Sequence, residues 1–549
     1  MVWLRTIIRW LRKPASGNFF FFIIILNLLS NYIYIIFNST FYIIICIFFI
    51  SSIIAYLENV IYLFINIKWL RYLYVFLIVT FQNVLIIFDV FLLFNFQKIL
   101  NQYVVDILAD TNSIEIDNFI QTYISTNFCL GIGLVVILLN ILIYYLSTIL
   151  VKSRANHFFL MSSLCGFFIT CFCGYSFIKY RNGMSIPQCS TITRGGYALY
   201  LMKVKKRQIG ELRNVCKDLE AYQVSSKKPI VVVVIGESYS IYHSSLYGYE
   251  KLTNPLLEKH YNNGNLFLFD NVVTVFDGTN ESMRAIFSLD SLGVDFSKHS
   301  LFPACFKAVG YNTFLFDNQY FVGSGVSLLT DKQLSDEMFD YRNKKRFLYD
   351  GMMVDSIKVL KPVSLYVFHL WGQHFNYSNR YPKEYSKFKA SEYSKENTNV
   401  QRKIMADYDN ATLYNDYVVD KILKKFQDQY CCVFYFSDHG EEIYELRDYM
   451  GHGNASYSPN LNYQIRVPLM VYFSPSFYNE NESLVKKMKK AEHYPICTDD
   501  IGHTIIDIAG IKVNDFVPSR SFINDQFDIN RHRIVLNSID YDVKWMRNK

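Results

Sequence analysis

Two apolar segments, far apart in the chain, end in side chains that can bind a metal ion. "IVVVVIGES" places Glu237 directly after a run of β-branched residues, and "CCVFYFSDHGEE" places Asp438 and His439 after a second run. Such runs are typical of buried strands in a parallel sheet, where ligands bind at the carboxyl ends. Zinc accepts carboxylate oxygen and imidazole nitrogen, and three protein ligands are the catalytic pattern. Alone, "DHG" is more often an N-capping Asp followed by a surface His, but its position after a second apolar strand, with Glu237 after the first, predicts a metal site.

A hydroxyl group in a third segment could act as a nucleophile at this site. "FDGTNESMRAIFSL" places Thr279 at or just before the start of a predicted helix. Most threonines at such positions are simple N-caps. The helix start also favours an anion, and a metal can lower the pKa of a bound hydroxyl. Ser282 is the competing hydroxyl, but three positions later we expect it to turn toward the core, so the prediction is Thr279.

Histidines follow in two further loops. "HLWGQHFNYSNRYP" contains His374, and "YMGHGN" contains His452 between two glycines. Each histidine alone is more often structural than catalytic, but neighbouring glycines allow close approach to a ligand. His369 lies within the preceding predicted strand, and we interpret it as a partly buried supporting residue.

The elements that must position these residues begin at Pro229. From there, predicted strands alternate with helical stretches, which is typical of a mostly parallel sheet covered by helices on both faces. The predicted strands cover residues 230–236, 266–273, 312–317, 364–370, 431–438 and 467–474. We therefore predict an α/β catalytic domain over residues 229–549.

The first third of the chain has the composition of a membrane domain. Five apolar stretches reach or exceed the roughly 20 residues that a spanning helix needs, near residues 17–37, 40–66, 71–95, 128–151 and 157–178. Basic residues precede the first stretch, so the positive-inside rule predicts a cytoplasmic N-terminus. Five spans would then place the catalytic domain outside. A cleaved signal peptide is the alternative for the first stretch, but more spans follow it.

The charge distribution and the cysteine spacing argue against two other features, a nucleic-acid-binding surface and a cysteine zinc site. The formal net charge of +7 comes from scattered basic residues, so nucleic-acid binding is not indicated. The 11 cysteines form no CxxC pair, so a cysteine zinc site is not indicated either.

The predicted organisation is a transmembrane domain over residues 1–180, a bridging segment over 181–228 and the catalytic domain over 229–549. Asp89 lies in or beside a span, and its role as a functional or an interfacial carboxylate stays open.

The motifs, in their order along the chain, resemble those of the membrane-bound phosphoethanolamine transferases. These belong to the alkaline phosphatase and sulfatase superfamily and include lipid A modifying and mobile colistin-resistance enzymes. The resemblance is carried by "VVVVIGESYSIYHSSLYGYEKLTNP", "GTNESMRAIFSL", "YNTFLFDNQ", "HLWGQHFNYSNRYP", "DYDNATLYNDYVVDKIL", "FYFSDHGEE" and "GHG". It implies that Glu237, Thr279, Asp438 and His439 bind zinc and that Thr279 is the nucleophile.

The same resemblance implies roles for residues around the metal. His374 and His452 would face the phosphoryl group or a second zinc, and Asn318 with Gln319 would line the substrate pocket. The chain departs from the lipid A enzymes by having Val275 and Ala285 in place of cysteines. A lysine expected shortly after Gln319 is also missing. These departures leave the acceptor open.

The implied function is transfer of phosphoethanolamine from phosphatidylethanolamine to lipid A, a core sugar or another envelope glycan. The implied protein is a monomer in a bacterial inner membrane, with a periplasmic catalytic domain and one or two zinc ions rather than manganese. A phosphoglycerol transferase of the same superfamily is the nearer alternative. A non-enzymatic protein with a degenerate domain is the farther one, and the presence of all four metal positions argues against it.

Overall fold

The computed structural model describes residues 11–545 except 12, 38–40, 97–98, 111–115, 117–118, 121–123, 125, 153–155, 181–190, 291–295, 320–326, 454 and 456–459. The chain folds into two compact units, Met1–Val204 and Lys205–Lys549. The division falls inside the predicted bridging range 181–228. The first ten residues and Arg12, which supply most of the basic charge used for the topology prediction, lie outside the described part, as do residues 181–190.

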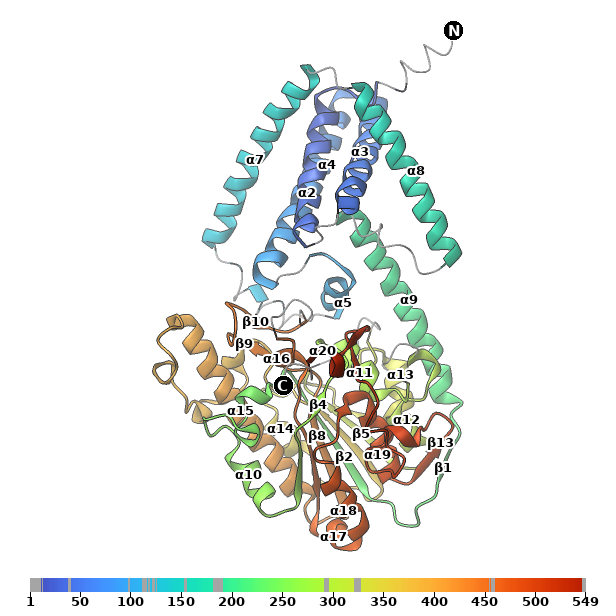
Figure 1. Ribbon diagram of the computed structural model, residues 1–549, viewed down its shortest axis with the longest axis vertical. Coiled ribbons are helices and arrows are strands. Elements are labelled where there is room, and N and C mark those ends of the chain that lie inside the picture. Colours follow the sequence, from blue (N-terminus) through green and yellow to red (C-terminus); the bar gives the residue numbers. More distant parts are fainter. Residues whose placement is uncertain are drawn as a thin grey trace. The chain divides into compact units, whose positions relative to one another are not determined.

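The first unit consists of helices. Three described helices are long and apolar enough to cross a membrane, at Ile44–Phe64, Lys68–Phe96 and Cys129–Lys152. Shorter apolar helices, Asn18–Asn31 and His157–Cys171, lie in the first and fifth predicted spans. The elements, shown in blue to green in Figure 1, are α2 (Asn18–Phe37), α3 (Phe41–Phe64), α4 (Lys68–Phe96), α5 (Gln102–Asp110), α7 (Thr126–Lys152), α8 (Asn156–Tyr180) and the first part of α9 (Thr191–Lys217).

Asp89 is buried inside this helical unit and is bound on several sides. It forms an ion pair with Arg194, and both side chains are almost fully buried. The Thr191 hydroxyl donates to Asp89 Oδ2 over 2.8 Å, and the Leu100 amide donates to Asp89 Oδ1 over 2.8 Å. Arg194 Nε in turn donates to the Leu100 carbonyl at 3.0 Å. Asp89 thus holds the start of α9 against α4, which explains a carboxylate in an apolar helix.

Asp89→Ala should destabilise the protein strongly, because it leaves the Arg194 guanidinium buried without its counter-charge. Removal of one partner of a buried pair typically costs about 3–5 kcal/mol. The expected result is a clearly lowered thermal unfolding midpoint in detergent. The double variant Asp89→Ala/Arg194→Ala should lose less than the sum of the two single variants, since the pair is removed together. An unchanged midpoint in Asp89→Ala would contradict this account of the residue.

The second unit is built on a seven-stranded sheet. Its order is β3 (Leu266–Phe269), β11 (Leu469–Phe473), β8 (Cys431–Ser437), β2 (Ile230–Gly236), β7 (Ser364–His369), β5 (Asn312–Asp317) and β6 (Tyr341–Arg342). Neighbouring strands from β8 to β6 pair in parallel. β11 pairs antiparallel with both of its neighbours. Parallel neighbours bring their carboxyl ends to one edge, where the predicted metal ligands lie.

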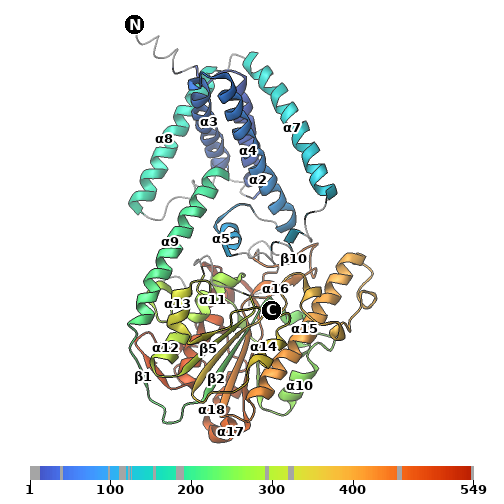
Figure 2. The same cartoon turned by 180° about the vertical axis from the view of Figure 1, so that it is seen from behind.

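Helices cover both faces of this sheet (Figures 1 and 2). Side chains alternate along a strand, so Val231, Val233 and Ile235 of β2 enter one core cluster and the intervening residues enter another. Helices of the first cluster include the second half of α9, α11 (Thr279–Phe287), α12 (Phe302–Ala308), α13 (Lys332–Met338), α18 (Glu482–Ala491) and α19 (Ile501–Ile508). Helices of the second are α10 (Pro255–Asn262), α14 (Gly351–Ser356) and α15 (Asn399–Phe426).

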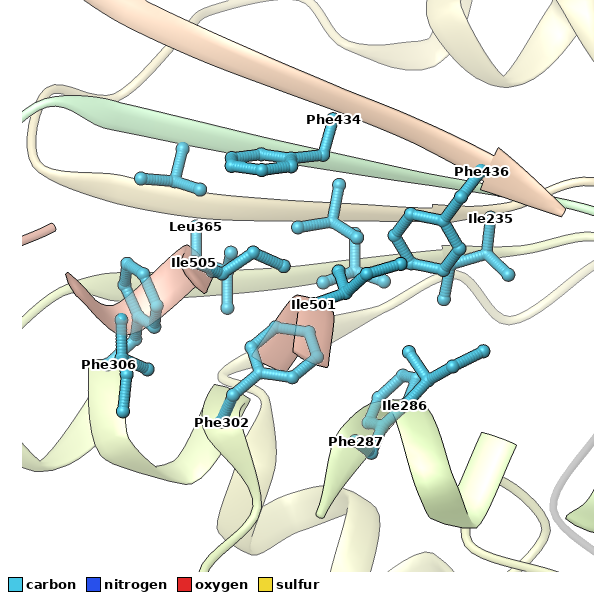
Figure 3. Packing of buried hydrophobic residues seen from close by; sticks show 14 of the residues in the cluster. Ile235, Ile286, Phe287, Phe302, Phe306, Leu365, Phe434, Phe436, Ile501 and Ile505 are labelled. Carbon is cyan, nitrogen blue, oxygen red and sulfur yellow. The ribbon is translucent and has the colours of Figure 1, made fainter. Parts of the chain in front are cut away.

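The core also fixes α11, the helix that begins with Thr279. Figure 3 shows Ile286 and Phe287 of this helix opposite Ile235 and Phe436, which lie near the ends of β2 and β8. All four side chains are fully buried. Burial of large apolar side chains is a major source of stability. The packing therefore holds α11 beside the two strand ends that carry the predicted ligands.

Candidate metal centre and active site

The register of β2 and β8 places two carboxylates side by side. Gly236 is opposite Ser437 in this parallel pair, and the next residues are Glu237 and Asp438. The Asp438 amide still donates to the Gly236 carbonyl, over 3.2 Å. Both acidic side chains are fully buried. The sheet thus supplies two carboxylates at one edge.

Thr279 is the first residue of α11, after Gly278 in the N-cap position. Its hydroxyl lies 3.3 Å from Glu237 Oε2 and 3.2 Å from His439 Nε2. Ser282, one turn later, is fully buried, and its hydroxyl donates to the Phe276 carbonyl over 3.0 Å. Of the two hydroxyls considered from the sequence, the structure brings Thr279 to the candidate ligands, while Ser282 faces the interior.

His439 presents one defined ring nitrogen to the site. Its Nδ1 lies 2.9 Å from the Gly440 carbonyl, so Nδ1 carries the proton and donates it. Its Nε2 lies 3.2 Å from Glu237 Oε1 and 3.3 Å from Asp438 Oδ2. A hydrogen bond through the outer nitrogen is the usual way in which proteins orient a metal-binding histidine. His439 Nε2 therefore has the tautomer and orientation of a ligand.

The electrostatics of the site favour a cation at its centre. Burial and the nearby Glu237 carboxylate raise the pKa of Asp438. Burial alone would lower the pKa of His439, but the carboxylates of Asp438 and Glu237 raise it to about 10. Burial likewise opposes ionisation of Glu237, yet the charge of His439 lowers the pKa of Glu237 well below its usual range. The two buried carboxylates thus create a strongly negative potential around His439 Nε2.

The residues fit a bound metal ion. Asp438 Oδ2 is buried and accepts no hydrogen bond from any residue that the structure describes. Such an orphaned oxygen is costly unless an ion or another group binds it. Ligand atoms of Glu237, His439 and His452 lie within 4.8 Å of one another. Together with the hydroxyl of Thr279, this donor set of oxygen and imidazole nitrogen suits zinc.

His452 is held in the site by a residue that sequence reasoning missed. Its Nδ1 lies 2.7 Å from Glu441 Oε2, and the Tyr377 hydroxyl donates to Glu441 Oε1 over 2.6 Å. Glu441 is buried, and burial raises its pKa to about 8. The rings of His452 and His439 are 3.9 Å apart between centroids. The second acidic position of "DHGEE" was the available signal for Glu441, and its structural role is to orient His452.

The loop after β7 brings His374 into the same neighbourhood. His374 is partly exposed, and its positive charge contributes to lowering the pKa of Glu237. Gly372, two residues earlier, has a φ of +50°, and a Cβ there would lie 2.9 Å from the backbone nitrogen of Glu237. Only glycine therefore fits this close approach. His369 is fully buried and bonded to Asp317 over 3.1 Å, in keeping with a supporting role.

Asn318 and Gln319 have different surroundings. Gln319 donates to Glu237 Oε2 over 2.9 Å and to the Leu370 carbonyl over 2.6 Å. Asn318 instead donates to Asp350 over 2.8 Å, and its side-chain oxygen accepts from the Phe347 amide at 2.7 Å. Gln319 thus orients a candidate ligand, and Asn318 connects two loops. Substrate binding by this pair stays a prediction.

Comparison with known proteins identifies the family to which this domain belongs. Residues 229–511, just over half of the chain, match the family model described as Sulfatase. The chain belongs to the sulfatase family. The matched range contains every predicted site residue, from Glu237 to His452.

Relatives of this sulfatase-family chain include phosphoethanolamine transferases. It is 31% identical over 318 residues to phosphoethanolamine transferase EptC of Escherichia coli O18:K1:H7, a match that covers 54% of this chain and 53% of the relative. The match thus spans about half the length of that curated relative. These matches confirm the resemblance to phosphoethanolamine transferases that the sequence motifs indicated.

Solved structures show the same fold. The C-terminal periplasmic domain of EptC from Escherichia coli, in complex with Zn, is 26% identical with a TM-score of 0.52, covering 59% of this chain and 96% of that one. Lipooligosaccharide phosphoethanolamine transferase A from Neisseria meningitidis, an integral membrane protein, has a TM-score of 0.61 at 16% identity. That alignment covers 92% of this chain and 98% of the other, and at this identity it establishes the fold alone.

Proposed function

We propose that the protein is a zinc-dependent phosphoethanolamine transferase that uses a covalent phospho-threonine intermediate. The observation that carries this proposal is the approach of the Thr279 hydroxyl to Glu237 and His439, within 3.3 Å of each. A hydroxyl at a helix start beside buried carboxylates and an imidazole is an arrangement for nucleophilic attack on phosphorus. The name of the relative EptC supports phosphoethanolamine as the transferred group, and the solved EptC domain in complex with Zn supports zinc as the metal.

Glu237, Thr279, Asp438 and His439 would hold the first zinc ion, and His452 with His374 would face the phosphoryl group or a second ion. When bound, zinc lowers the pKa of a coordinated hydroxyl and stabilises negative charge on phosphoryl oxygens. Gln319 keeps Glu237 in place, and the Gly440 carbonyl keeps His439 in its tautomer. The protein thus supplies a preorganised set of donors around Thr279.

The chemistry proceeds in two displacements. Thr279 Oγ attacks the phosphorus of phosphatidylethanolamine in line, a new P–O bond forms, and the bond to the diacylglycerol oxygen breaks. His374 or His452 protonates that leaving oxygen. The acceptor hydroxyl or phosphate then attacks the phosphorus, any proton that it carries passes to the histidine that protonated the leaving oxygen, and Thr279 Oγ leaves. Glu441, bonded to Nδ1 of His452, orients the ring so that proton transfer uses Nε2.

The proposed membrane location of the protein follows from its proposed donor, because phosphatidylethanolamine is a membrane lipid. The proposal places the helical unit in a bacterial inner membrane with five spans and a cytoplasmic N-terminus, so that the catalytic unit is periplasmic. Three described helices support membrane insertion by length and composition. The protein would act as a monomer, and the acceptor would be lipid A, a core sugar or another envelope glycan. The name of the relative EptC favours phosphoethanolamine over phosphoglycerol as the transferred group.

The test is transfer by the purified full-length protein in detergent with zinc. Phosphatidylethanolamine carrying an isotope-labelled ethanolamine is supplied with extracted envelope glycolipids, and products are identified by mass spectrometry. Labelled phosphoethanolamine on a glycolipid, together with released diacylglycerol, is the expected result. Transfer from phosphatidylglycerol in place of phosphatidylethanolamine would refute the assignment of the donor.

A further inference from the structure

Thr274 lies between the metal-binding strand end and the nucleophile helix. It directly follows the short strand β4 (Val272–Val273) and is fully buried. Its hydroxyl donates to the backbone carbonyl of Asp438 over 2.6 Å. Its own amide donates to the Ile465 carbonyl over 2.8 Å. A residue outside the predicted site thus contacts the backbone of a candidate metal ligand.

The same hydroxyl contacts two further buried hydroxyl groups. Ser282 Oγ lies 3.3 Å away, and Thr498 Oγ1 donates to it over 3.3 Å. A hydroxyl has one donor and two acceptor sites, so the single proton of Thr274 goes to Asp438 and one acceptor site serves Thr498, while Ser282, whose own proton goes to the Phe276 carbonyl, packs against it. Ser282 is on the first turn of α11, three residues after Thr279. Thr274 therefore bonds the Asp438 backbone and contacts the helix that carries the nucleophile.

We propose that Thr274 is a positioning residue that sets the separation between Thr279 and the metal ligands. The inference rests on the proposed function. The Asp438 carbonyl directly precedes His439, so the bond from Thr274 fixes the backbone that carries two candidate ligands. A misplacement of a reacting group by about 1 Å can reduce the rate by about 100-fold. Partners of metal ligands also typically contribute 10- to 100-fold to metal affinity.

The test compares Thr274→Val, which keeps the shape and removes the hydroxyl, with Thr274→Ser, which restores it. In Thr274→Val we expect kcat to fall about 10- to 100-fold with little change in KM. Zinc affinity, measured by chelator competition on the metal-free protein, should fall about 10-fold. Thr274→Ser should recover most of both. Thr313→Val is the matched control, because Thr313 is also fully buried and donates a single side-chain hydrogen bond, to Asp340 over 3.1 Å.

The two measurements separate this inference from the proposed function. If the unmodified protein transfers no phosphoethanolamine, the proposed function fails, and zinc affinity alone decides the role of Thr274. Equal zinc affinity and kcat in Thr274→Val and Thr313→Val would overturn the inference, as would failure of Thr274→Ser to recover them. If Thr274→Val does not fold, Thr274→Ala also removes the hydroxyl that bonds the Asp438 carbonyl, and unchanged zinc affinity and kcat in that variant overturn the inference.

Discussion

Thr279→Ala should reduce phosphoethanolamine transfer by at least about 10³-fold, since loss of a catalytic nucleophile can reduce kcat by as much as about 10⁶-fold. The hydroxyl is the group that lies 3.3 Å from Glu237 Oε2 and 3.2 Å from His439 Nε2. The fold should survive, because Thr279 is only partly buried and its side chain is not the cap of α11. The measurement is transfer from labelled phosphatidylethanolamine, with the thermal unfolding midpoint as the check on folding.

Intact-protein and peptide mass spectrometry gives a second readout of the same prediction. After incubation with donor lipid and without acceptor, a phosphoethanolamine adduct should map to Thr279. Thr279→Ser should retain a trace of adduct, because a primary hydroxyl still reaches the ligands. Ser282→Ala is the matched control and should still form the adduct on Thr279, since Ser282 faces Phe276. An adduct on Ser282, or one that persists in Thr279→Ala, would show that the nucleophile is a different residue.

The edge of the sheet could be predicted from the sequence for a physical reason. Strands buried on both faces appear as unbroken apolar runs, so the first polar side chains after them mark the edge where ligands bind. This pointed to Glu237 after β2, and to Asp438 with His439 after β8, as the structure shows. The start of α11 was visible in the same way, from Gly278 and the apolar spacing after it. Local patterns therefore predicted the start of α11, and the resemblance to the transferase family added the expectation that Thr279 lies beside the candidate ligands.

Partners that meet only through packing could not be predicted. Glu441 and His452 are 11 residues apart, and Arg194 and Asp89 are 105 apart, so no local pattern joins them. Thr274 gave no signal either, since a threonine after a β-branched pair is typical of any strand. The pair Asn318 and Gln319 illustrates another limit. Their sequence position suggested a shared role, but the two adjacent side chains diverge, one to Asp350 and the other to Glu237.

Removal of metal ligands should have the other large effect. Asp438→Ala and His439→Ala should each remove activity and most bound zinc, and the double variant should retain none. Partners that merely support a metal ligand typically contribute 10- to 100-fold to affinity, so loss of a direct ligand should weaken zinc binding by at least about 100-fold. The measurement is elemental analysis of protein purified with limiting zinc, together with chelator competition.

His493→Ala is the matched control, because His493 is exposed and pairs only with Asp270 among the interactions that the structure describes. It should keep both zinc and activity. Full zinc occupancy in the Asp438→Ala/His439→Ala variant would show that the ion is bound elsewhere.

The prediction depends on the negative potential of the site. Glu237 and Asp438 are buried side by side, and Asp438 Oδ2 accepts no hydrogen bond from the described residues. Without a cation or protons, two such carboxylates would repel each other in a medium that screens charge poorly, so a bound metal ion would stabilise the same residues that hold it beside Thr279.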